Sequence, residues 1–364
     1  MRTCAESGLL VCRYGPAMLR SIRTSNGLVV QKVLGTIGGK LRICLSSREV
    51  IWGGGESFLH ALGAELTSRG IEVRWRVEPD SELARRIPKE SMVHRRKRAT
   101  YDLLIANDFR SFWQAVALDG PRRKVFVGHG PWQFSPVRVK LLNAVRAKTF
   151  VVSDSVAAEA VAKGFTRKPE VLPLGPNARQ GVTSRMPRDF ASMKVTDLVF
   201  GCVARLDPIK RLPVFVRAIE ELGARSIVVV PEPASPDEAL LHQFLMESAN
   251  IELRTGGDVD SLWDDVDVFL STSKSESLGL AHLEALQSGI PVISTAANGP
   301  GDFLTGELRL GWIPHVEMEQ LSNEIAGRLA LMQSASKAYW SEATRVLESR
   351  SISRCADLIL GTAQ

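Results

Sequence analysis

Short runs of apolar and β-branched residues alternate with amphipathic helical patterns along most of the chain. In the first half, such runs predict strands at residues 41–45, 71–77, 103–106, 124–128, 149–152 and 170–174. In the second half, they predict strands at 198–203, 226–230, 250–253, 266–270, 291–294 and 310–313. Alternating strands and helices form parallel sheets covered by helices, so an α/β fold with two such sheets is predicted.

The domain boundary is predicted within residues 175–194, where Pro, Gly and Arg occur without sustained periodicity. This divides the chain into a Rossmann-like domain at 41–180, a second one at 195–340 and terminal helices at 341–364. Residues 1–40 hold six Lys or Arg but a single acidic residue, Glu6, and no apolar period, which predicts a poorly ordered extension. The extension is either a targeting segment or an over-extended start.

Composition excludes several classes of protein. The 364 residues are 45% hydrophobic and 24% charged, which is typical of globular proteins, and no apolar run approaches the ~18 residues of a membrane helix. The five cysteines are scattered without metal-ligand spacing, so reduced thiols in a cytoplasm are expected. The net charge of +6 permits acidic partners, and the basic stretch 85–98 is a solvated helix face or loop, or else a contact to anionic lipid or to an acidic acceptor. Because no aromatic residues interleave with that stretch, nucleic-acid binding is not expected.

Residues 271–293 carry the most specific chemical signal. Glu276 precedes a predicted helix, and Glu284 is expected about two turns inside it. Eight helical residues rise ~12 Å, whereas two carboxylates acting on one glycosidic bond lie roughly 5–9.5 Å apart. The glutamates are therefore expected to contact different parts of one long ligand. Backbone N–H groups of Leu278, Gly279 and Leu280 at the helix start suit a phosphate, and a nucleotide-sugar matches this layout.

Spacing alone favours two exposed surface glutamates. The segment, however, closely resembles the Glu-x7-Glu signature of retaining glycosyltransferases with the GT-B fold, known as glycosyl transferases group 1 or family 4. Its fixed positions are matched by Ser273, Glu276, Gly279, Glu284, Ala285, Gly289, Pro291, Val292 and Ile293. The resemblance implies two Rossmann-like domains with a cleft between them, Glu276 at the transferred sugar and Glu284 at the ribose.

A second signal follows the strand at 198–203. Arg205 and Lys210 flank the turn expected at Asp207 and Pro208, at the carboxyl edge of the sheet. A lone cation there more often caps a carbonyl or faces solvent. The stretch resembles the Gly-Arg-Leu-x-x-x-Lys-Gly element of the same family, whose Arg and Lys bind the donor diphosphate. The resemblance implies that this pair stabilises the departing nucleotide.

A third signal lies in residues 51–70, where three glycines open a predicted helix. Their spacing does not supply a dinucleotide fingerprint, and without context they are merely a turn. The stretch resembles the family's Gly-Gly-x-Glu loop. That resemblance places Gly54 and Gly55 at the donor diphosphate and Glu56 on the acceptor side.

His129 follows the strand at 124–128 and has a glycine on each side, so its ring is expected to be open to the cleft. A lone histidine is more often structural, but the position resembles a family histidine that contacts the transferred sugar. Asn107 and Asp108 are weaker acceptor-side candidates, and His282 is interpreted as a packing residue. One departure from the family is Pro231-Glu232-Pro233 in place of a Gly-x-Gly loop, which leaves the donor base undetermined.

The resulting hypothesis is a retaining transfer of sugar from a nucleoside-diphosphate sugar to a hydroxyl of a glycan, glycolipid or small molecule. Polysaccharide, lipopolysaccharide or glycoconjugate biosynthesis in the cytoplasm is the expected setting, with contact to the inner membrane surface left open. No metal or other cofactor is expected. The alternatives are a nucleotide-sugar epimerase of the same fold, which the Glu276 and Glu284 pattern disfavours, and an inactive sugar-nucleotide-binding partner of another transferase.

Overall fold

The structure is a computed structural model that describes residues 22–24, 27–29, 41–50, 53–94, 96–176, 193–256 and 259–361. It contains two compact units, Met1–Leu41 and Arg42–Gln364. In the first unit, strands β1 (Ile22–Thr24) and β2 (Gly27–Val29) form an antiparallel pair. The rest of the expected extension at 1–40, and most of the predicted boundary at 175–194, lie outside the described residues.

The first sheet of the larger unit is parallel, with strand order β4-β3-β5-β6-β7-β8. Its strands are β3 (Arg42–Ser47), β4 (Glu72–Val77), β5 (Leu103–Ala106), β6 (Arg123–Gly128), β7 (Lys148–Val151) and β8 (Glu170–Val171). The connecting helices are α1 (Gly54–Ser68), α2 (Glu82–Arg86), α3 (Phe109–Asp119), α4 (Pro136–Ala144) and α5 (Asp154–Ala162). All of β5 is buried, as expected for a central strand covered on both faces.

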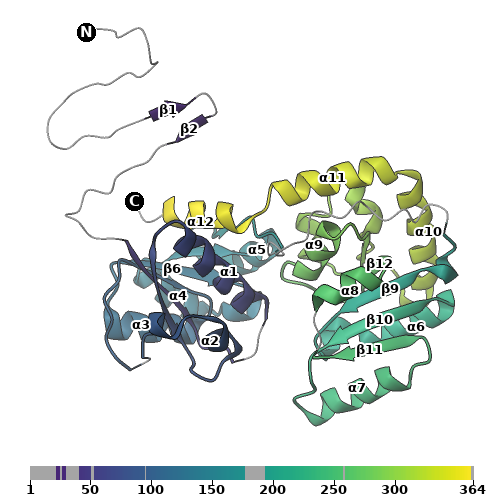
Figure 1. Cartoon of the computed structure of the whole chain (residues 1–364), viewed down its shortest axis with the longest axis horizontal. Helices are drawn as coiled ribbons and strands as arrows, with labels where there is room; N and C mark the ends of the chain where they lie inside the picture. Colours follow the sequence, from purple (N-terminus) through teal and green to yellow (C-terminus); the bar gives the residue numbers. More distant parts are fainter. Residues whose placement is uncertain are drawn as a thin grey trace, which may run out of the picture. The chain divides into compact units, whose positions relative to one another are not determined.

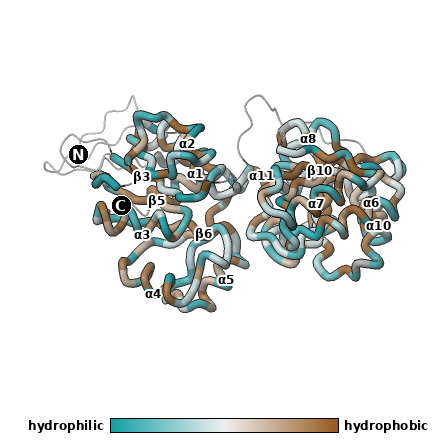
Figure 2. The backbone as a smooth tube through the Cα atoms, turned by 90° about the horizontal axis from the view of Figure 1, so that it is seen from below, coloured by the Kyte–Doolittle hydropathy of each residue, from teal (hydrophilic) through white to brown (hydrophobic). Residues whose placement is uncertain are grey.

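The second sheet is also parallel, with order β11-β10-β9-β12-β13. Its strands are β9 (Val199–Val203), β10 (Arg225–Val230), β11 (Ile251–Thr255), β12 (Val268–Ser271) and β13 (Val292–Ser294). The associated helices are α6 (Leu212–Leu222), α7 (Pro236–Glu247), α8 (Val259–Asp265), α9 (Leu280–Gln287) and α10 (Leu321–Ser334). Figure 2 shows hydrophobic segments along β5 and β10, inside each layer of helices. The predicted α/β fold with two parallel sheets is confirmed.

Short 3-10 turns complete the connections: η1 (Lys89–Ser91), η2 (Pro131–Gln133), η3 (Val195–Asp197), η4 (Pro208–Lys210), η5 (Pro300–Asp302), η6 (Gly306–Gly311) and η7 (Met318–Gln320). The prediction of a strand at 310–313 is wrong, because this segment follows and partly overlaps the 3-10 turn η6. Backbone N–H groups of Leu308 and Trp312 donate to carbonyls three residues earlier, which closes 3-10 turns. Gly306, with φ of 52°, favours this turning path, and Trp312 keeps a single bridge to Ser294 of β13.

Two helices end the described chain, α11 (Ser336–Glu348) and α12 (Ile352–Gly361). Helix α11 packs near α9, and the backbone N–H of Val292 donates to the Tyr339 hydroxyl over 3.0 Å. Helix α12, yellow in Figure 1, lies along α1, drawn in purple. There the Arg69 guanidinium donates to Asp357 Oδ1 and Ser353 Oγ, each over 2.6 Å. Among the helices in the described ranges, none has both the length and the apolar composition needed to span a bilayer.

Candidate functional site

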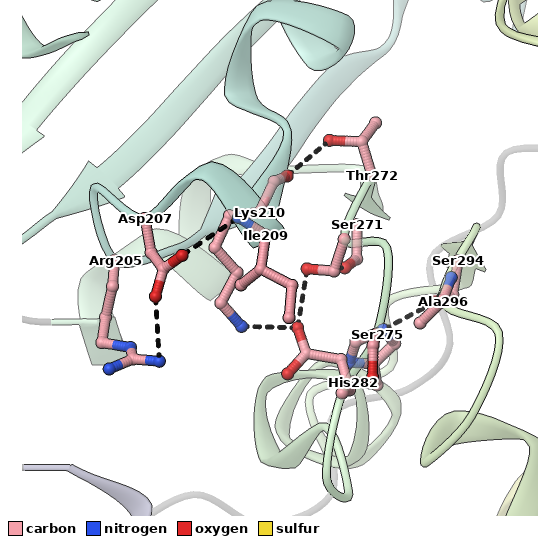
Figure 3. Close-up of polar contacts among 12 residues, drawn as sticks. Arg205, Asp207, Ile209, Lys210, Ser271, Thr272, Ser275, His282, Ser294 and Ala296 are labelled. Atoms are coloured by element: carbon pink, nitrogen blue, oxygen red, sulfur yellow. Dashed lines mark hydrogen bonds and ion pairs between the residues drawn. The ribbon is translucent and has the colours of Figure 1, made fainter. Parts of the chain in front are cut away.

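Lys210 and Glu276 form the central ion pair of the second sheet. Lys210 ends η4 after β9, and Glu276 lies in the loop after β12. Because β9 and β12 are parallel neighbours, both residues lie at the same carboxyl edge. Lys210 Nζ is 2.6 Å from Glu276 Oε1, and both side chains are largely buried, with 14% and 16% of their areas exposed (Figure 3).

The electrostatics keep Glu276 ionised. Burial is the largest single influence and acts to raise the pKa of its carboxyl, but Lys210, His282 and the Ser273 hydroxyl together hold the pKa below its ordinary value. Ser273 Oγ also donates to Oε1 over 2.7 Å. The carboxylate is therefore held in one position beside a cation, where it can accept a hydrogen bond from a hydroxyl group.

Arg211 holds this edge together at the cost of backbone strain. Its φ of 50° and ψ of 44° lie in the left-handed region, which usually costs a non-glycine residue about 1–2 kcal/mol. The guanidinium donates to the carbonyls of Thr272 and Ser273, over 2.7 and 3.2 Å, and to Thr295 Oγ1 over 2.7 Å. These bonds connect the turn that carries Lys210 to the loop that carries Glu276.

Arg205 lies apart from that pair. Strand β9 ends at Val203, so Arg205 belongs to the following turn rather than to the end of the strand. Its side chain is 69% exposed and forms a 3.6 Å ion pair with Asp207, drawn as a dashed line in Figure 3. Such surface pairs are weak. The guanidinium can reorient toward a ligand with little loss of energy.

The glutamate helix starts later than the sequence predicts. Helix α9 begins at Leu280, whereas we expected the first turn to include Leu278 and Gly279. Leu278 is buried before the helix, and Gly279 caps it with φ of 89°. A Cβ at Gly279 would lie 2.7 Å from His282 Nδ1, so glycine is required there. Glu284 consequently lies about one turn inside the helix, not two.

His282 packs in the core of the second sheet. Its ring lies 5.1 Å from the Phe269 ring and 6.3 Å from the Phe303 ring, and Nε2 bonds to Ser294 Oγ over 3.0 Å. Burial lowers its pKa to about 4, so the ring is neutral near pH 7. This environment is that of a packing residue.

Glu56 and Asn107 form the polar cluster of the first sheet. Glu56 is the third residue of α1 and is nearly fully buried. Its Oε1 accepts from Asn107 Nδ2 over 3.0 Å and from Ser47 Oγ over 3.2 Å. Burial raises the pKa of the Glu56 carboxyl. A Cβ at Gly55 would lie 3.0 Å from Asn107 Nδ2, so this close approach depends on glycine.

His129 joins the same cluster but is more enclosed than we expected. Its ring packs 5.5 Å from the Phe58 ring, and burial lowers its pKa to about 4. Two buried polar atoms, His129 Nε2 and Asn107 Oδ1, have no hydrogen-bond partner among the described residues. Such atoms are costly unless a ligand satisfies them. A ligand that reached these two atoms would supply the hydrogen bonds they lack.

Asp108 has a structural environment. Its Oδ1 accepts from the backbone N–H of Ser111 and its Oδ2 from that of Arg48, each over 2.8 Å. The carboxylate caps α3 and fixes the loop after β3. The sequence placed it on the acceptor side because it follows a strand, but the same position also suits a helix cap.

Two glycine-capped helix starts meet between these clusters. Helix α1 follows Gly53 and α9 follows Gly279, and neither cap makes a side-chain hydrogen bond. By contrast, Ser or Asp side chains cap α2, α3, α4, α5 and α7. A Cβ at Gly54 would lie 3.2 Å from Leu280 Cδ1, which shows how close the two starts are. Uncapped N–H groups and the positive ends of two helix dipoles favour an anion at this place.

A small cavity at this junction is lined by Phe58, Leu280, Glu284 and Ile352, among others. Its volume of about 10 Å³ suits one water molecule rather than a nucleotide.

Several residues of the site were missed by sequence reasoning. Gln133 accepts from the His129 backbone N–H over 2.6 Å and donates to the Asn107 carbonyl over 2.7 Å. Asn298 Oδ1 accepts from the Glu276 backbone N–H over 3.2 Å. No local sequence pattern predicts a role for either residue. Arg211 was also missed, although an arginine where the family motif has glycine was a visible departure that could have drawn attention to it. Within the described ranges, no cluster of three or more His, Cys, Asp or Glu is arranged to hold a metal ion.

Comparisons with known proteins bear on the fold and on the second domain. A GDP-mannose-dependent α-mannosyltransferase of Mycobacterium tuberculosis is 26% identical over 170 residues, which cover 45% of this chain and 43% of that enzyme. The chain therefore matches less than half the length of this relative. Among solved structures, sucrose-phosphate synthase of Thermosynechococcus elongatus is similar with a TM-score of 0.67 and 17% identity, covering 88% of this chain and 98% of that one.

HepE of Anabaena, solved with UDP and glucose, is similar with a TM-score of 0.65 and 16% identity, covering 88% of this chain and 99% of that one. These likenesses confirm the GT-B fold across most of the chain. Residues 197–329, which include the Lys210–Glu276 pair and α9, match the family model described as glycosyl transferases group 1.

Proposed function

We propose that this protein is a retaining glycosyltransferase that moves a sugar from a nucleoside-diphosphate sugar to an acceptor hydroxyl. The observation that carries the proposal is the meeting of two glycine-capped helix starts between the Lys210–Glu276 pair and the polar cluster around His129. The first half supplies buried hydrogen-bonding groups and the second supplies an ion pair. A sugar linked to a diphosphate needs both kinds of group.

In this proposal the donor diphosphate lies against the free N–H groups at the start of α9. Lys210, with Arg205 reorienting from Asp207, neutralises the charge that develops on the departing nucleotide. Glu276 accepts a hydrogen bond from a hydroxyl of the transferred sugar, and Glu284 binds the ribose. Gly54 and Gly55 allow the backbone of α1 to approach the diphosphate.

Transfer breaks the bond between the anomeric carbon and the diphosphate oxygen and forms a bond from that carbon to the acceptor oxygen on the same face. The departing phosphate oxygen takes the acceptor proton, so the reaction requires no metal or organic cofactor. His129 is neutral because burial lowers its pKa to about 4. Its unpartnered Nε2 therefore contacts the sugar as a dipole, while Glu56 and Asn107 face the acceptor side.

We further propose that the reaction serves the synthesis of a glycan or glycolipid in the cytoplasm, with peripheral contact to the inner membrane surface where the acceptor is lipid-linked. Three cysteines of the larger unit, Cys44, Cys202 and Cys355, are free and buried, which supports a reducing compartment. The base of the donor nucleotide is a question for experiment, since the loop at Pro231 departs from the family pattern.

The test incubates the purified protein with UDP-, GDP- and ADP-sugars, with and without a mixture of acceptor saccharides. Nucleotide release is measured, and the anomeric configuration of the product is determined by NMR. We expect acceptor-dependent release with retention of configuration, and loss of release in Glu276→Gln and Lys210→Met. Interconversion of the nucleotide-sugar without acceptor would show an epimerase instead. Binding of a nucleotide-sugar with no turnover would show an inactive binding partner.

A further inference from the structure

A second and larger cavity opens in the first domain, at the carboxyl ends of β3, β4, β5 and β6. Its volume is about 500 Å³, which is the size of a saccharide site rather than of a single water. Its wall includes three arginines, two aromatic residues and one glutamine: Arg48, Arg110, Arg138, Phe109, Trp132 and Gln133. None of the residues proposed to bind the donor lines this cavity.

Aromatic groups form part of its wall. Trp132, on the short turn η2, exposes 67% of its surface beside the cavity. An exposed tryptophan of this kind offers a flat apolar face with a polar edge, which matches the C–H face of a sugar ring. The ring of Phe109 also lines the cavity. It holds the Arg138 guanidinium by a cation–π contact, with 5.3 Å between the guanidinium carbon and the ring centre.

The charges that line the cavity are unevenly compensated. Arg48 is paired with Glu78 over 2.6 Å, and the Asp108 carboxylate accepts two backbone N–H groups. Arg138 donates only to the carbonyls of Trp132 and Gln133, each over 3.3 Å.

Neither Arg138 nor the exposed Arg110 has a carboxylate partner among the described residues. Glu49 is a carboxylate on the wall that likewise lacks an ion pair there. Besides the ion pair of Arg48, the wall therefore carries two guanidinium groups without an ion pair in the described ranges and two carboxylates, Glu49 and the hydrogen-bonded Asp108. Guanidinium groups bind carboxylate and phosphate oxygens in a two-pronged geometry.

Gln133 connects the cavity to the polar cluster. Its side chain lines the cavity and also bonds the backbone of both His129 and Asn107, over 2.6 and 2.7 Å. A ligand in the cavity therefore lies beside the atoms where the transferred sugar is expected. This is the position that an acceptor must take.

We propose that this cavity binds the acceptor as a saccharide that carries an anionic substituent, either a carboxylate or a phosphate. Trp132 covers a face of the sugar ring, and Arg110 and Arg138 bind the anionic group. The acceptor role rests on the proposed glycosyltransferase function. The preference for an anionic saccharide rests on the cavity alone.

The binding test uses the full chain and saturation-transfer NMR titrations with methyl β-D-glucuronide, glucose 6-phosphate and methyl β-D-glucoside. We expect the carboxylate or the phosphate probe to bind about tenfold more tightly than the neutral glucoside, as one charge-assisted hydrogen-bonded pair allows. Which of the two anionic probes binds better identifies the substituent. Equal binding of all three probes, or none, overturns the proposal.

Variants locate the binding. Arg110→Gln and Trp132→Ala are expected to weaken the preferred probe about fivefold or more, whereas Glu49→Gln should strengthen it. The matched control is Arg122→Gln, which removes an exposed arginine just before β6, at the opposite end of the strand. Equal losses in Arg110→Gln and Arg122→Gln would show a general charge effect and overturn the assignment.

A separate readout distinguishes this inference from the proposed function. Binding of the nucleotide-sugar in the absence of acceptor, measured by calorimetric titration, reports on the donor site alone and should be unchanged in Arg110→Gln, whereas the KM for the preferred saccharide as acceptor should rise. If no nucleotide-sugar is used but the anionic probe still binds in an Arg110-dependent manner, the cavity assignment stands and the acceptor role is overturned.

Discussion

The two halves of the candidate site satisfy their polar groups in different ways. In the second domain, Lys210 and Glu276 neutralise each other at 2.6 Å, and Ser273 completes the carboxylate. In the first domain, His129 Nε2 and Asn107 Oδ1 are buried without a partner among the described residues. The ion pair of the second domain is complete as it stands, although His282 Nδ1 is also buried without a partner among the described residues, whereas the polar cluster of the first domain has two such atoms.

This difference indicates how each half contributes. A prepaired charge cluster is preorganised, so it can stabilise a departing diphosphate without rearranging. A cluster with unpartnered atoms recovers their desolvation cost only when a ligand of the right shape binds, which favours selectivity. We therefore expect charge changes to act mainly on turnover and first-domain changes mainly on acceptor choice.

The largest expected effect comes from removing the buried cation. Lys210→Met should lower kcat/KM. The loss should correspond to about 2–4 kcal/mol of transition-state stabilisation, the range for loss of one electrostatic stabiliser. The exposed Arg205→Ala, by comparison, should cost no more than Lys210→Met, because Arg205 must first reorient. Steady-state kinetics with the preferred donor measures both. Activity within threefold of wild type in Lys210→Met would remove this lysine from the site.

The next effect uses one buried histidine from each half. The pKa values of His129 and His282 are lowered to about 4, so the unfolded chain binds more protons between about pH 4 and 6.5. The free energy of unfolding should therefore fall as pH drops through this window, by on the order of 2 kcal/mol per histidine. His129→Gln and His282→Gln should each reduce that fall, measured by urea unfolding at pH 7 and pH 4.5. A pH dependence identical to wild type in both variants would contradict the burial argument.

A smaller effect separates strain from hydrogen bonding at Arg211. Both Arg211→Ala and Arg211→Gly lose the bonds to the Thr272 and Ser273 carbonyls, but only glycine relieves the φ of 50°. Arg211→Ala should therefore be less stable than Arg211→Gly by about 1 kcal/mol. Urea unfolding of the two variants measures this difference directly. Because glycine costs about 0.5–1 kcal/mol more backbone entropy than alanine, equal stabilities would show that the strain at this position is no larger than that cost.

The affinity for the donor tests the proposed contact between Glu284 and the ribose, with an expected effect similar in size to that at Arg211. Glu284→Ala should weaken nucleotide-sugar binding by about 1–1.5 kcal/mol through lost hydrogen bonds. Calorimetric titration with the donor that the protein uses provides the measurement. Glu324→Ala, which removes a carboxylate from the exposed pair with Arg328 on α10, serves as the control. Affinity unchanged in Glu284→Ala would exclude this carboxylate from the donor site.

The smallest effect is expected outside both halves. Residues Arg42–Gln364 form a compact unit by themselves, and β3 begins at Arg42. A chain that starts at Lys40 should fold with a midpoint of urea unfolding close to that of the full chain and bind nucleotide-sugar equally well. Aggregation of the shortened chain, or loss of nucleotide binding, would show that the removed residues belong to the fold.

The sequence predicted the sheets well because buried parallel strands are continuous apolar runs, as β5 and β10 show. It failed at 310–313, where an equally apolar run forms turns, because apolar content does not distinguish a strand from a buried turn. It also placed the start of α9 too early. Leu278 is apolar like the helix, and the conformation of Gly279 that ends the preceding loop is set by packing against His282.

The site was predictable where residues follow each other closely in the chain and not where contacts join distant segments. Lys210 and Glu276 each lie in a recognisable motif, and the parallel pairing of β9 and β12 explains why they meet. Gln133 connects His129 and Asn107 only through the neighbouring positions of β5 and β6. The exposed position of Arg205 depends on where β9 ends, which apolar periodicity locates only within a few residues.

The contact between α12 and α1 has a consequence for the order of assembly during synthesis. Cys355, Ala356 and Ile359 of α12 are buried, and Arg69 of α1 bonds to Asp357 and Ser353. The surface of α1 that receives α12 emerges from the ribosome almost three hundred residues before its partner. The first domain to be translated is therefore completed last, and until then a nascent chain exposes both the surface of α1 that α12 covers and, once α12 is made, the apolar residues of α12 that pack there.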